Sequence, residues 1–463
     1  MNRILLACMI TVASLAFMTA CATVQHTTPL KQDVKLPASD EFTLTRQELP
    51  DEIEDLQRIP QDVRTFADAI SSPLAGDEQA RAVQRFRERY FSPWLATEPL
   101  SGIKQAVEGM NEFAGKTWYG ENRLKVDPAR IKRMLAPVAQ GRIPSQNQAG
   151  IAIAPTFLRA LPTSKPFYET ADDFPFDQLQ YSEVKPNEPV RILYVTDNGA
   201  WVFVSTAYGY GWVRSGTVVP VSEAMQQHLT DAPLLAIVVD FAIIRDEQGK
   251  ALPLPRIGTL YPLVREEADN WLVNVAVSGE GDQAALKTGR ISKQDARRFP
   301  LTFAAGTVAH IGNELLKTPY GWGELFRDRD CSATTRDFFI PFGIWLPRNS
   351  RQQLNSGPFV SLSNMSKADK ERLLREQGVP FRTLVHRKGH IMLYIGLVGG
   401  KPVVLHNTWA VRFKTKEGRE EKFYIGRTVL TTLEAGDELP LSRGTHLDHI
   451  NGILTLPATK PVN

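Results

Sequence analysis

The chain has 463 residues, of which 43% are hydrophobic and 23% charged, and its formal net charge is +3. This length predicts two to four domains, and the composition is that of ordinary globular proteins. The charge is small, and the sequence has neither a block of like charge nor basic residues interleaved with aromatic ones, so nothing in it favours a nucleic-acid partner.

The first residues have the pattern of an export signal. Arg3 gives a short positive start, an apolar run ends at Met18, and small residues precede Cys21. The run is too short to span a membrane, which takes about 20 residues. The small residues before Cys21 resemble a bacterial lipoprotein cleavage box, with Met18 where such boxes prefer Leu. The resemblance implies a signal peptide over 1–20, a lipid on Cys21 and a tether over 21–50. A plain secreted protein and an uncleaved anchor are the alternatives.

Residues 51–149 show a helical pattern. Val83, Phe86 and Tyr90 fall on one helical face of GDEQARAVQRFRERYFSPW, and SGIKQAVEGMNEFAG and DPARIKRMLAPVA are amphipathic in the same way. No combination of residues here suggests catalysis. We therefore predict a helical stabilising domain whose function is packing.

From about residue 150 to 303 the pattern changes to short β-runs separated by turn residues. Two segments repeat one another, LYVTDNGAWVFVSTAYGYGWV at 193–213 and LYPLVREEADNWLVNVAV at 260–277. Each has Leu-Tyr, then Asp-Asn, then a Trp that opens an alternating strand. An internal repeat of this size predicts two small β-barrels, one over 150–228 and one over 229–303.

The first of these predicted barrels resembles bacterial SH3 domains. The likeness lies in Trp201, which opens a strand, and in Trp212 with its glycine and valine neighbours. We expect most aromatic residues of both modules to fill the barrel cores, whereas exposed ones would line a groove for peptide or glycan. Tyr208 and Tyr210 are candidates to reach a neighbouring site.

Cys331 lies in the segment RDRDCSATTRDFF, and cleavage before Cys21 would leave it as the single thiol of the folded part. An unpaired thiol in an exported protein suggests a reactive function, and a buried cysteine acting as a small hydrophobe is the alternative. The polar neighbours predict a loop entering a helix, with Asp330 as N-cap and Cys331 in the first turn. The helix dipole is expected to lower the pKa of a thiol placed there.

Two histidines are candidates to activate this thiol, because a nucleophile needs a base and a group that orients the base. His390 starts the alternating strand of GHIMLYIGLV, and His406 ends the apolar run of KPVVLHNTW. Gly399 and Gly400 between them are suited to a hairpin turn. Antiparallel pairing would bring the imidazoles together, so that His406 could hold the tautomer of His390 that abstracts the thiol proton.

Residues 305 to about 450 resemble the NlpC/P60 family of papain-like cysteine peptidases. The motifs occur in the family's order: TPYGWG, DCS, LPRNSRQQ, GHIMLYIG and finally His406. The resemblance implies a papain-like α+β domain over 304–463. With the helical domain over 51–149 and the two SH3-like barrels, the expected fold is multidomain α+β, as in lipid-anchored members that carry tandem bacterial SH3 domains.

The resemblance also implies roles for particular residues. Cys331 would be the nucleophile, His390 the general base and His406 the group that orients it. Backbone N–H groups at the helix start, including that of Cys331, would stabilise the oxyanion. Tyr320, Asp330 and Ser332 would line the substrate site.

Three features depart from the family pattern or lie beside it. Glu324 follows Gly323 where the family usually has a second glycine, which leaves the shape of the substrate loop open. Ala333 replaces a glycine after Ser332 and is the better helix former. His446 and His449, near the end of the chain, are expected to be solvated.

By this resemblance we expect a peptidoglycan hydrolase, a cysteine endopeptidase that cleaves stem peptides at the bond from γ-D-glutamate to a diamino acid. The alternative is a catalytically silent peptidoglycan-binding lipoprotein that uses its SH3-like domains. A zinc site of Cys331, His390 and His406 is a further hypothesis, which lacks a fourth ligand motif. An acyltransferase is another, although related acyltransferases have the His before the Cys.

The expected partners are the stem peptide and a membrane, reached through the lipid on Cys21. We expect no cofactor, no metal, no nucleic acid and a monomer. Ala22 rather than Asp follows Cys21. By resemblance to Gram-negative lipoproteins, this implies an exported protein anchored in the outer membrane and facing the periplasm.

Overall fold

The computed structural model describes residues 50–68, 70, 74, 76–95, 100–415, 418–440 and 444–457. The predicted signal peptide, the lipidated Cys21 and the tether up to residue 49 lie outside these residues. Within the described part of the chain, no helix combines the length and the apolar character needed to cross a membrane.

The N-terminal region is helical, as predicted. Its helices are α1 (Glu54–Arg58), α2 (Arg64–Ala67), α3 (Gly76–Tyr90), α4 (Ser92–Leu95), α5 (Leu100–Asn111) and α6 (Pro128–Ala139). Three of them, α3, α5 and α6, coincide with the amphipathic segments of the sequence. Phe86 and Tyr90 of α3 are buried in the largest hydrophobic core, together with residues of the C-terminal domain. Asp127 caps α6 by accepting a hydrogen bond from the backbone N–H of Ala129 at 2.8 Å.

The next region forms a seven-stranded antiparallel sheet in the order β3-β2-β6-β5-β4-β1-β7. The strands are β1 (Gln148–Ala152), β2 (Thr156–Arg159), β3 (Gln180–Val184), β4 (Pro189–Val195), β5 (Trp201–Thr206), β6 (Gly209–Arg214) and β7 (Val218–Pro220), and α7 (Glu223–Asp231) follows. Trp201 opens β5 as predicted. It is buried in one core with Trp212 and Phe203, which confirms that these aromatic side chains have a packing function.

The second β-region has its own five-stranded sheet, in the order β11-β10-β9-β8-β12. Its strands are β8 (Leu234–Ile237), β9 (Leu260–Glu266), β10 (Asn270–Ser278), β11 (Ala284–Ser292) and β12 (Ala296–Arg298). Trp271, the repeat counterpart of Trp201, lies in β10 and donates its indole N–H to the carbonyl of Ala296 at 3.1 Å. Tyr261 is fully buried in the same core.

The C-terminal region combines helices with a six-stranded sheet in the order β13-β18-β14-β15-β16-β17. Its strands are β13 (Phe359–Ser361), β14 (Thr383–Arg387), β15 (His390–Val398), β16 (Lys401–Lys414), β17 (Glu420–Thr432) and β18 (Ile450–Thr455). The helices are α8 (Ala305–Leu316), α9 (Cys331–Phe339), α10 (Ser350–Gln353), α11 (Lys367–Gln377) and α12 (His446–His449). With the helical region and the β-regions before it, this confirms the multidomain α+β fold.

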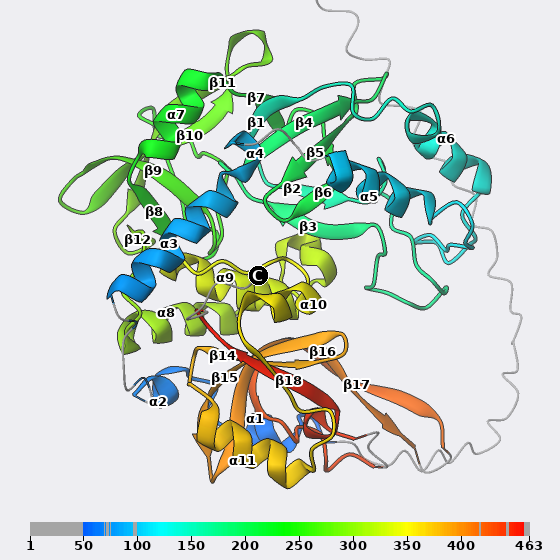
Figure 1. Cartoon of the computed structure of the whole chain (residues 1–463), viewed down its shortest axis with the longest axis vertical. Helices are drawn as coiled ribbons and strands as arrows, with labels where there is room; N and C mark the ends of the chain where they lie inside the picture. The colour runs from blue at the N-terminus through cyan, green and yellow to red at the C-terminus, as the bar shows by residue number, and fades with distance from the viewer. Residues whose placement is uncertain are drawn as a thin grey trace, which may run out of the picture. The chain divides into compact units, whose positions relative to one another are not determined.

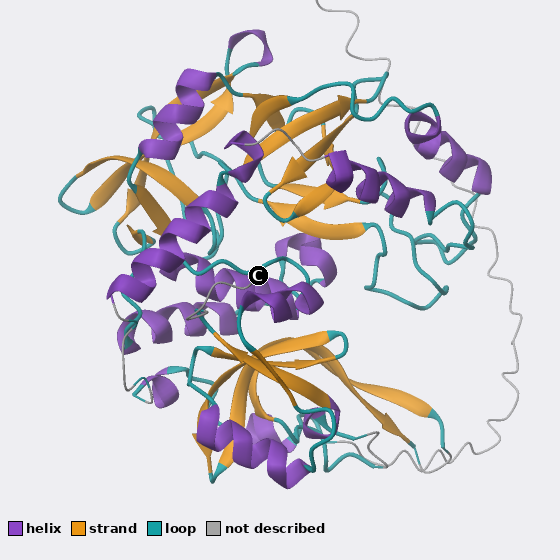
Figure 2. Cartoon of the chain, in the orientation of Figure 1, coloured by secondary structure: helices purple, strands orange, loops and turns teal. Residues whose placement is uncertain are grey.

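The alternation of β15 decides which helix covers which face of this sheet. Ile391 and Leu393 share a core with Phe338 of α9, whereas Met392 and Tyr394 pack with Leu374 of α11. The sheet therefore lies between α9 and α11, as Figure 1 and Figure 2 show. The start of β15 and the start of α9 are brought together by this arrangement, and these two ends carry His390 and Cys331.

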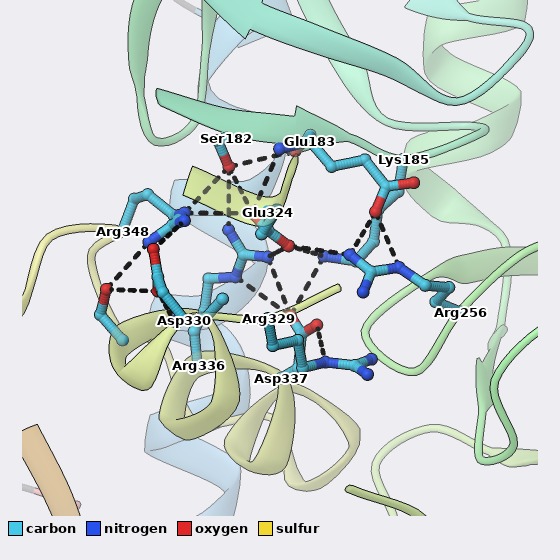
Figure 3. A network of polar contacts seen from close by, with 12 residues as sticks. Ser182, Glu183, Lys185, Arg256, Glu324, Arg329, Asp330, Arg336, Asp337 and Arg348 are labelled. Carbon is cyan, nitrogen blue, oxygen red and sulfur yellow. Dashed lines mark hydrogen bonds and ion pairs between the residues drawn. The ribbon is translucent and has the colours of Figure 1, made fainter. Parts of the chain in front are cut away.

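A buried carboxylate joins the C-terminal domain to both β-regions (Figure 3). Glu324 is fully buried and forms ion pairs with four cations: Arg336 at 2.8 Å, Arg256 at 3.0 Å, Arg348 at 3.0 Å and Lys185 at 3.7 Å. Lys185 follows β3, Arg256 lies between β8 and β9, and Arg336 is on α9. Burial alone would raise the pKa of Glu324, but these charges hold it well below its usual range.

Asp337 of α9 extends this network. Its carboxylate contacts Lys185 at 3.1 Å, Arg329 at 2.8 Å and Arg336 at 2.9 Å. The two buried carboxylates therefore share Lys185 and Arg336. Removing one member of such a buried cluster leaves unpaired charges out of water, which destabilises proteins strongly.

We predict that Glu324→Gln, which keeps the size of the side chain and removes its charge, lowers the free energy of unfolding by about 3–5 kcal/mol. The reason is that Arg336 and Arg348 lose a buried counter-charge. Urea unfolding followed by tryptophan fluorescence measures the change. Glu376→Gln on the exposed face of α11 is the control and should leave stability within about 0.5 kcal/mol of the parent. Equal stability of the two variants would contradict the proposed importance of the network.

Candidate active site

Cys331 lies in a cavity of about 800 Å³. Several parts of the chain line it: α5, the first β-region, the segment from Tyr320 to Ser332, the segment from Arg348 to Gln352, the end of the six-stranded sheet near His390, and His446 of α12. Tyr208 and Tyr210 are among the lining residues, as the sequence suggested. The contribution of α5, through Gln105 and Met110 among others, was not expected from the sequence. The helical region therefore does more than pack.

The local structure around Cys331 follows the sequence prediction. α9 begins at Cys331, and Asp330 is its N-cap, accepting a hydrogen bond from the backbone N–H of Ala333 at 2.8 Å. Gly323, in the segment that leads to α9, must be a glycine. Its φ is +59°, and a Cβ there would lie 2.4 Å from the carbonyl oxygen of Gln180. Glu324 then leads the chain into the buried network.

The expectation of a lowered thiol pKa is wrong. Cys331 is only 9% exposed. Burial and the adjacent charge of Asp330 raise the pKa of the thiol to about 12, although backbone N–H groups of Ile391 and Ser332 and the charge of Arg348 act in the opposite direction. The helix N-terminus is outweighed because the thiolate would be desolvated beside a carboxylate. At rest the sulfur therefore carries its proton.

The two predicted histidines meet as expected. β15 and β16 pair in antiparallel fashion across the Gly399-Gly400 turn, and His390 Nε2 lies 2.8 Å from His406 Nδ1. His406 Nε2 lies 3.0 Å from the hydroxyl of Thr431 on β17. Thr431 gives its hydroxyl proton to the carbonyl of Thr432 at 2.8 Å.

These hydrogen bonds determine the tautomers. Because the proton of Thr431 is used elsewhere, its oxygen accepts from His406 Nε2–H, which leaves a lone pair on His406 Nδ1. His406 Nδ1 then accepts from His390 Nε2–H. The remaining lone pair of His390 is on Nδ1, and His390 lines the same cavity as Cys331. Thr431 thus acts as a positioning residue that the sequence analysis did not identify.

Both rings are neutral near pH 7. Burial lowers the pKa of His406 to about 3, with a further contribution from the charge of Arg387. Burial and the neighbouring rings hold the pKa of His390 well below its ordinary value. The resting pair is therefore a neutral thiol beside a neutral imidazole.

The expectation that His446 is solvated is wrong. Its ring lies 5.2 Å from that of His390 at an interplanar angle of 14° and 5.2 Å from that of His406. Arg387 Nη1 donates to His446 Nδ1 at 3.3 Å, and burial holds the pKa of His446 well below its ordinary value. His449 is exposed, as expected.

The three predicted substrate residues, Tyr320, Asp330 and Ser332, all line the cavity. Asp330 is held by the guanidinium of Arg348 through two hydrogen bonds, of 2.7 and 3.0 Å, and the same guanidinium donates to Ser332 Oγ at 2.8 Å. Arg348 also reaches Glu324, so it connects the residues that flank Cys331 to the buried network. It lies within the quoted motif LPRNSRQQ, which was the available signal for it. Tyr320 is a neutral phenol, because burial and the nearby Cys331 and Asp330 raise its pKa.

Comparison with protein families finds three matching regions. Residues 8–141 match the N-terminal stabilising domain of NlpC/P60 proteins, residues 166–214 an SH3 domain of the SH3b1 type, and residues 317–426 the NlpC/P60 family. Cys331, His390 and His406 all lie within the third region.

A curated relative is the γ-D-glutamyl-L-lysine dipeptidyl-peptidase of Bacillus cereus, 27% identical over 171 residues, or 36% of this chain and 48% of the relative. The chain thus matches about half the length of this relative. Among solved structures, a novel NlpC/P60 endopeptidase from Photobacterium damselae subsp. piscicida has the same fold, with a TM-score of 0.78 at 21% identity, covering 89% of this chain and 99% of that one. An NlpC/P60 family protein from Bacillus cereus aligns with a TM-score of 0.41 at 18% identity, over 60% of this chain and 82% of its own. The chain therefore contains an NlpC/P60 domain, preceded by an N-terminal stabilising domain of the NlpC/P60 type and an SH3b-type SH3 domain.

Proposed function

We propose that this protein is a cysteine endopeptidase that hydrolyses peptidoglycan stem peptides between γ-D-glutamate and a diamino acid. The observation that carries the proposal is the ordered relay from Thr431 through His406 to His390, which leaves a basic nitrogen in the cavity that holds the Cys331 thiol. A nucleophile, a base and a group that orients the base are the minimum for thiol catalysis.

In the proposed reaction, His390 Nδ1 takes the proton of Cys331 as Sγ attacks the carbonyl carbon of the scissile amide. The resulting oxyanion accepts hydrogen bonds at the N-terminus of α9, where the backbone N–H of Cys331 points out of the helix. His390 then gives the proton to the leaving amine, and a thioester remains. Water, deprotonated by the same nitrogen, hydrolyses the thioester and restores the thiol.

The charges of the cavity favour an anionic peptide. Among the described residues that line it, Asp330 is the one carboxylate, against the cations Arg348, Arg351, Arg387, Arg412 and Lys422. In a γ-linked stem, the α-carboxylate of D-glutamate is free beside the scissile bond, and diaminopimelate adds another carboxylate. The negative charges of these carboxylates would compensate the positive charges of the residues that line the cavity.

Two of these cations, Arg412 and Lys422, lie opposite one another at the cavity. They are direct partners in the register of β16 and β17, and like charges opposite one another destabilise a sheet. Asp173 lies close enough to interact with both. Asp173 compensates these two cations in part, and because both line the cavity they can also attract a carboxylate of the substrate.

The name of one relative supports the same substrate class, because the Bacillus cereus protein is named for a γ-D-glutamyl-L-lysine bond. We extend the proposal to an exported protein held by a lipid on Cys21 in the outer membrane, on the basis of the N-terminal sequence pattern. The first, SH3-like β-region is proposed to narrow access to the cavity, since its Tyr208 stacks on Trp345 at 4.8 Å while lining it.

The direct test is mass spectrometry of L-Ala-γ-D-Glu-diaminopimelate and its longer forms after incubation with soluble protein from residue 22 onward. We expect cleavage at the D-glutamyl bond, and a loss of at least about 10³-fold in Cys331→Ala because the nucleophile is removed. Cleavage that survives in Cys331→Ala would contradict the mechanism. No cleavage of these peptides or of purified sacculi would favour a silent wall-binding protein.

A second prediction follows from the raised pKa of the Cys331 thiol. A thiol with a pKa of about 12 is almost fully protonated at pH 7, so its thiolate fraction grows about tenfold per pH unit. Alkylation of Cys331 by iodoacetamide, followed by intact mass, should therefore rise steadily from pH 7 to about 10. The control, Cys331→Ala with Lys132→Cys, carries its thiol on the exposed face of α6 and should level off above about pH 9. A plateau for Cys331 below pH 8 would instead indicate a thiolate-imidazolium pair.

A third prediction concerns Lys422, one of the cations that line the cavity. Lys422→Gln should raise KM for the stem peptide about fivefold, corresponding to roughly 1 kcal/mol of lost ion pairing, and the difference should shrink at high salt. The variant should be no less stable than the parent, because the substitution removes a like-charge cross-strand pair. Lys132→Gln, on α6 away from the cavity, should leave KM unchanged. An unchanged KM in Lys422→Gln would remove this residue from the substrate site.

A further inference from the structure

Three imidazoles meet beside the thiol. His390, His406 and His446 each place a ring nitrogen within 4.8 Å of the other two, and their ring centroids lie 5.1, 5.2 and 5.2 Å apart. Three imidazoles on one tetrahedral zinc ion, with Zn–N bonds of about 2.0–2.1 Å, have ring centroids about 5 Å apart. The ring centroids therefore have nearly the spacing of a three-histidine metal site, and the ring nitrogens, now up to 4.8 Å apart, would turn toward the ion until they lie about 3.4 Å from one another.

We propose that His390, His406 and His446 bind a divalent transition-metal ion, zinc in the first place, and that the bound ion switches off the thiol chemistry. The binding site is independent of any reaction, whereas the inhibitory effect rests on the proposed function. Three neutral imidazoles are good ligands for zinc. His390 and His446 line the cavity, so a metal ion can reach the rings, and water from the cavity would fill the fourth position.

His406 has the supporting contact that metal-bound histidines need. Its Nε2–H is held by Thr431, so the lone pair of Nδ1 is fixed toward the other two rings. Such outer hydrogen bonds orient ligating histidines and strengthen metal sites. The zinc site that the sequence suggested used Cys331 with His390 and His406, whereas the structure groups His446 with the two histidines.

Metal binding and catalysis compete through His390, because metal on Nε2 changes which of its nitrogens carries the proton. The ion replaces the proton between His390 Nε2 and His406 Nδ1, which now lie 2.8 Å apart, and the rings must separate by a few tenths of an ångström to hold it. That proton moves through solvent to His390 Nδ1, so the ring remains neutral and no net proton is lost. The nitrogen that would take the proton of Cys331 is then occupied.

One neighbour opposes the ion. Arg387 donates to His446 Nδ1 at 3.3 Å, and its positive charge repels a divalent cation. Arg387→Gln keeps a hydrogen-bond donor at this position and removes the positive charge. Its effect on metal affinity should therefore be opposite to that of removing a ligand. The variant should bind metal several-fold more tightly than the parent.

The test is a titration of the full chain with Co²⁺, followed by the visible absorption of tetrahedral cobalt. We expect binding in the parent and in Cys331→Ala, binding weakened at least about tenfold in His446→Ala, and tighter binding in Arg387→Gln. Equal affinity in His446→Ala, or loss of binding in Cys331→Ala, would overturn the three-histidine site. The latter result would indicate a cysteine-histidine pair, which a sulfur-to-cobalt charge-transfer band would also reveal.

A second arm separates this proposal from the proposed function. Peptide cleavage is measured with and without Zn²⁺, and each variant is compared with its own metal-free rate. Inhibition that weakens at least about tenfold in His446→Ala supports the switch. Equal inhibition in that variant contradicts it. If cobalt binds as expected but no stem peptide is cleaved, the metal site stands and the peptidase assignment fails.

Discussion

The structure depends on the burial of one charge, the carboxylate of Glu324. Four cations from three regions of the chain converge on it. No single region could bury its share of this cluster alone, because an unpaired guanidinium or carboxylate out of water is strongly unfavourable. The SH3-like region, the second β-region and the start of α9 are therefore held together by electrostatics as well as by apolar packing. Arg348 extends this constraint to Asp330, directly beside Cys331.

Much of this arrangement could be predicted from the sequence, because it follows from local rules. The alternation of GHIMLYIGLV gave β15 and both of its faces, and the N-cap of Asp330 gave the start of α9. The proximity of His390 and His406 followed from a two-glycine turn between strands. Each of these features depends on residues close together in the chain, where spacing and turn chemistry are sufficient.

The features that were missed depend on long-range contacts. Glu324 replaces an expected glycine, and nothing near it in sequence shows that Lys185 and Arg256 will surround it. Along the chain, most of β15 and all of β16 and β17 lie between His390 and His446. The proximity of the two rings could therefore be seen only in the folded structure. The pKa of Cys331 was predicted with the wrong sign, because the helix dipole is a local feature whereas burial is a property of the whole domain.

The raised pKa has a consequence for a protein with one unpaired cysteine. The thiolate is the form that attacks disulfides and reacts with oxidants, so a thiol kept protonated at rest reacts slowly with both. In the proposed exported setting, this protection matters because the surroundings are oxidising. In the proposed mechanism, each catalytic cycle must then remove this proton within the enzyme–substrate complex, with His390 Nδ1 as the acceptor. An ordered relay ending at Thr431 then becomes necessary rather than incidental, because a neutral pair can react only if the base presents the correct nitrogen at the moment of attack.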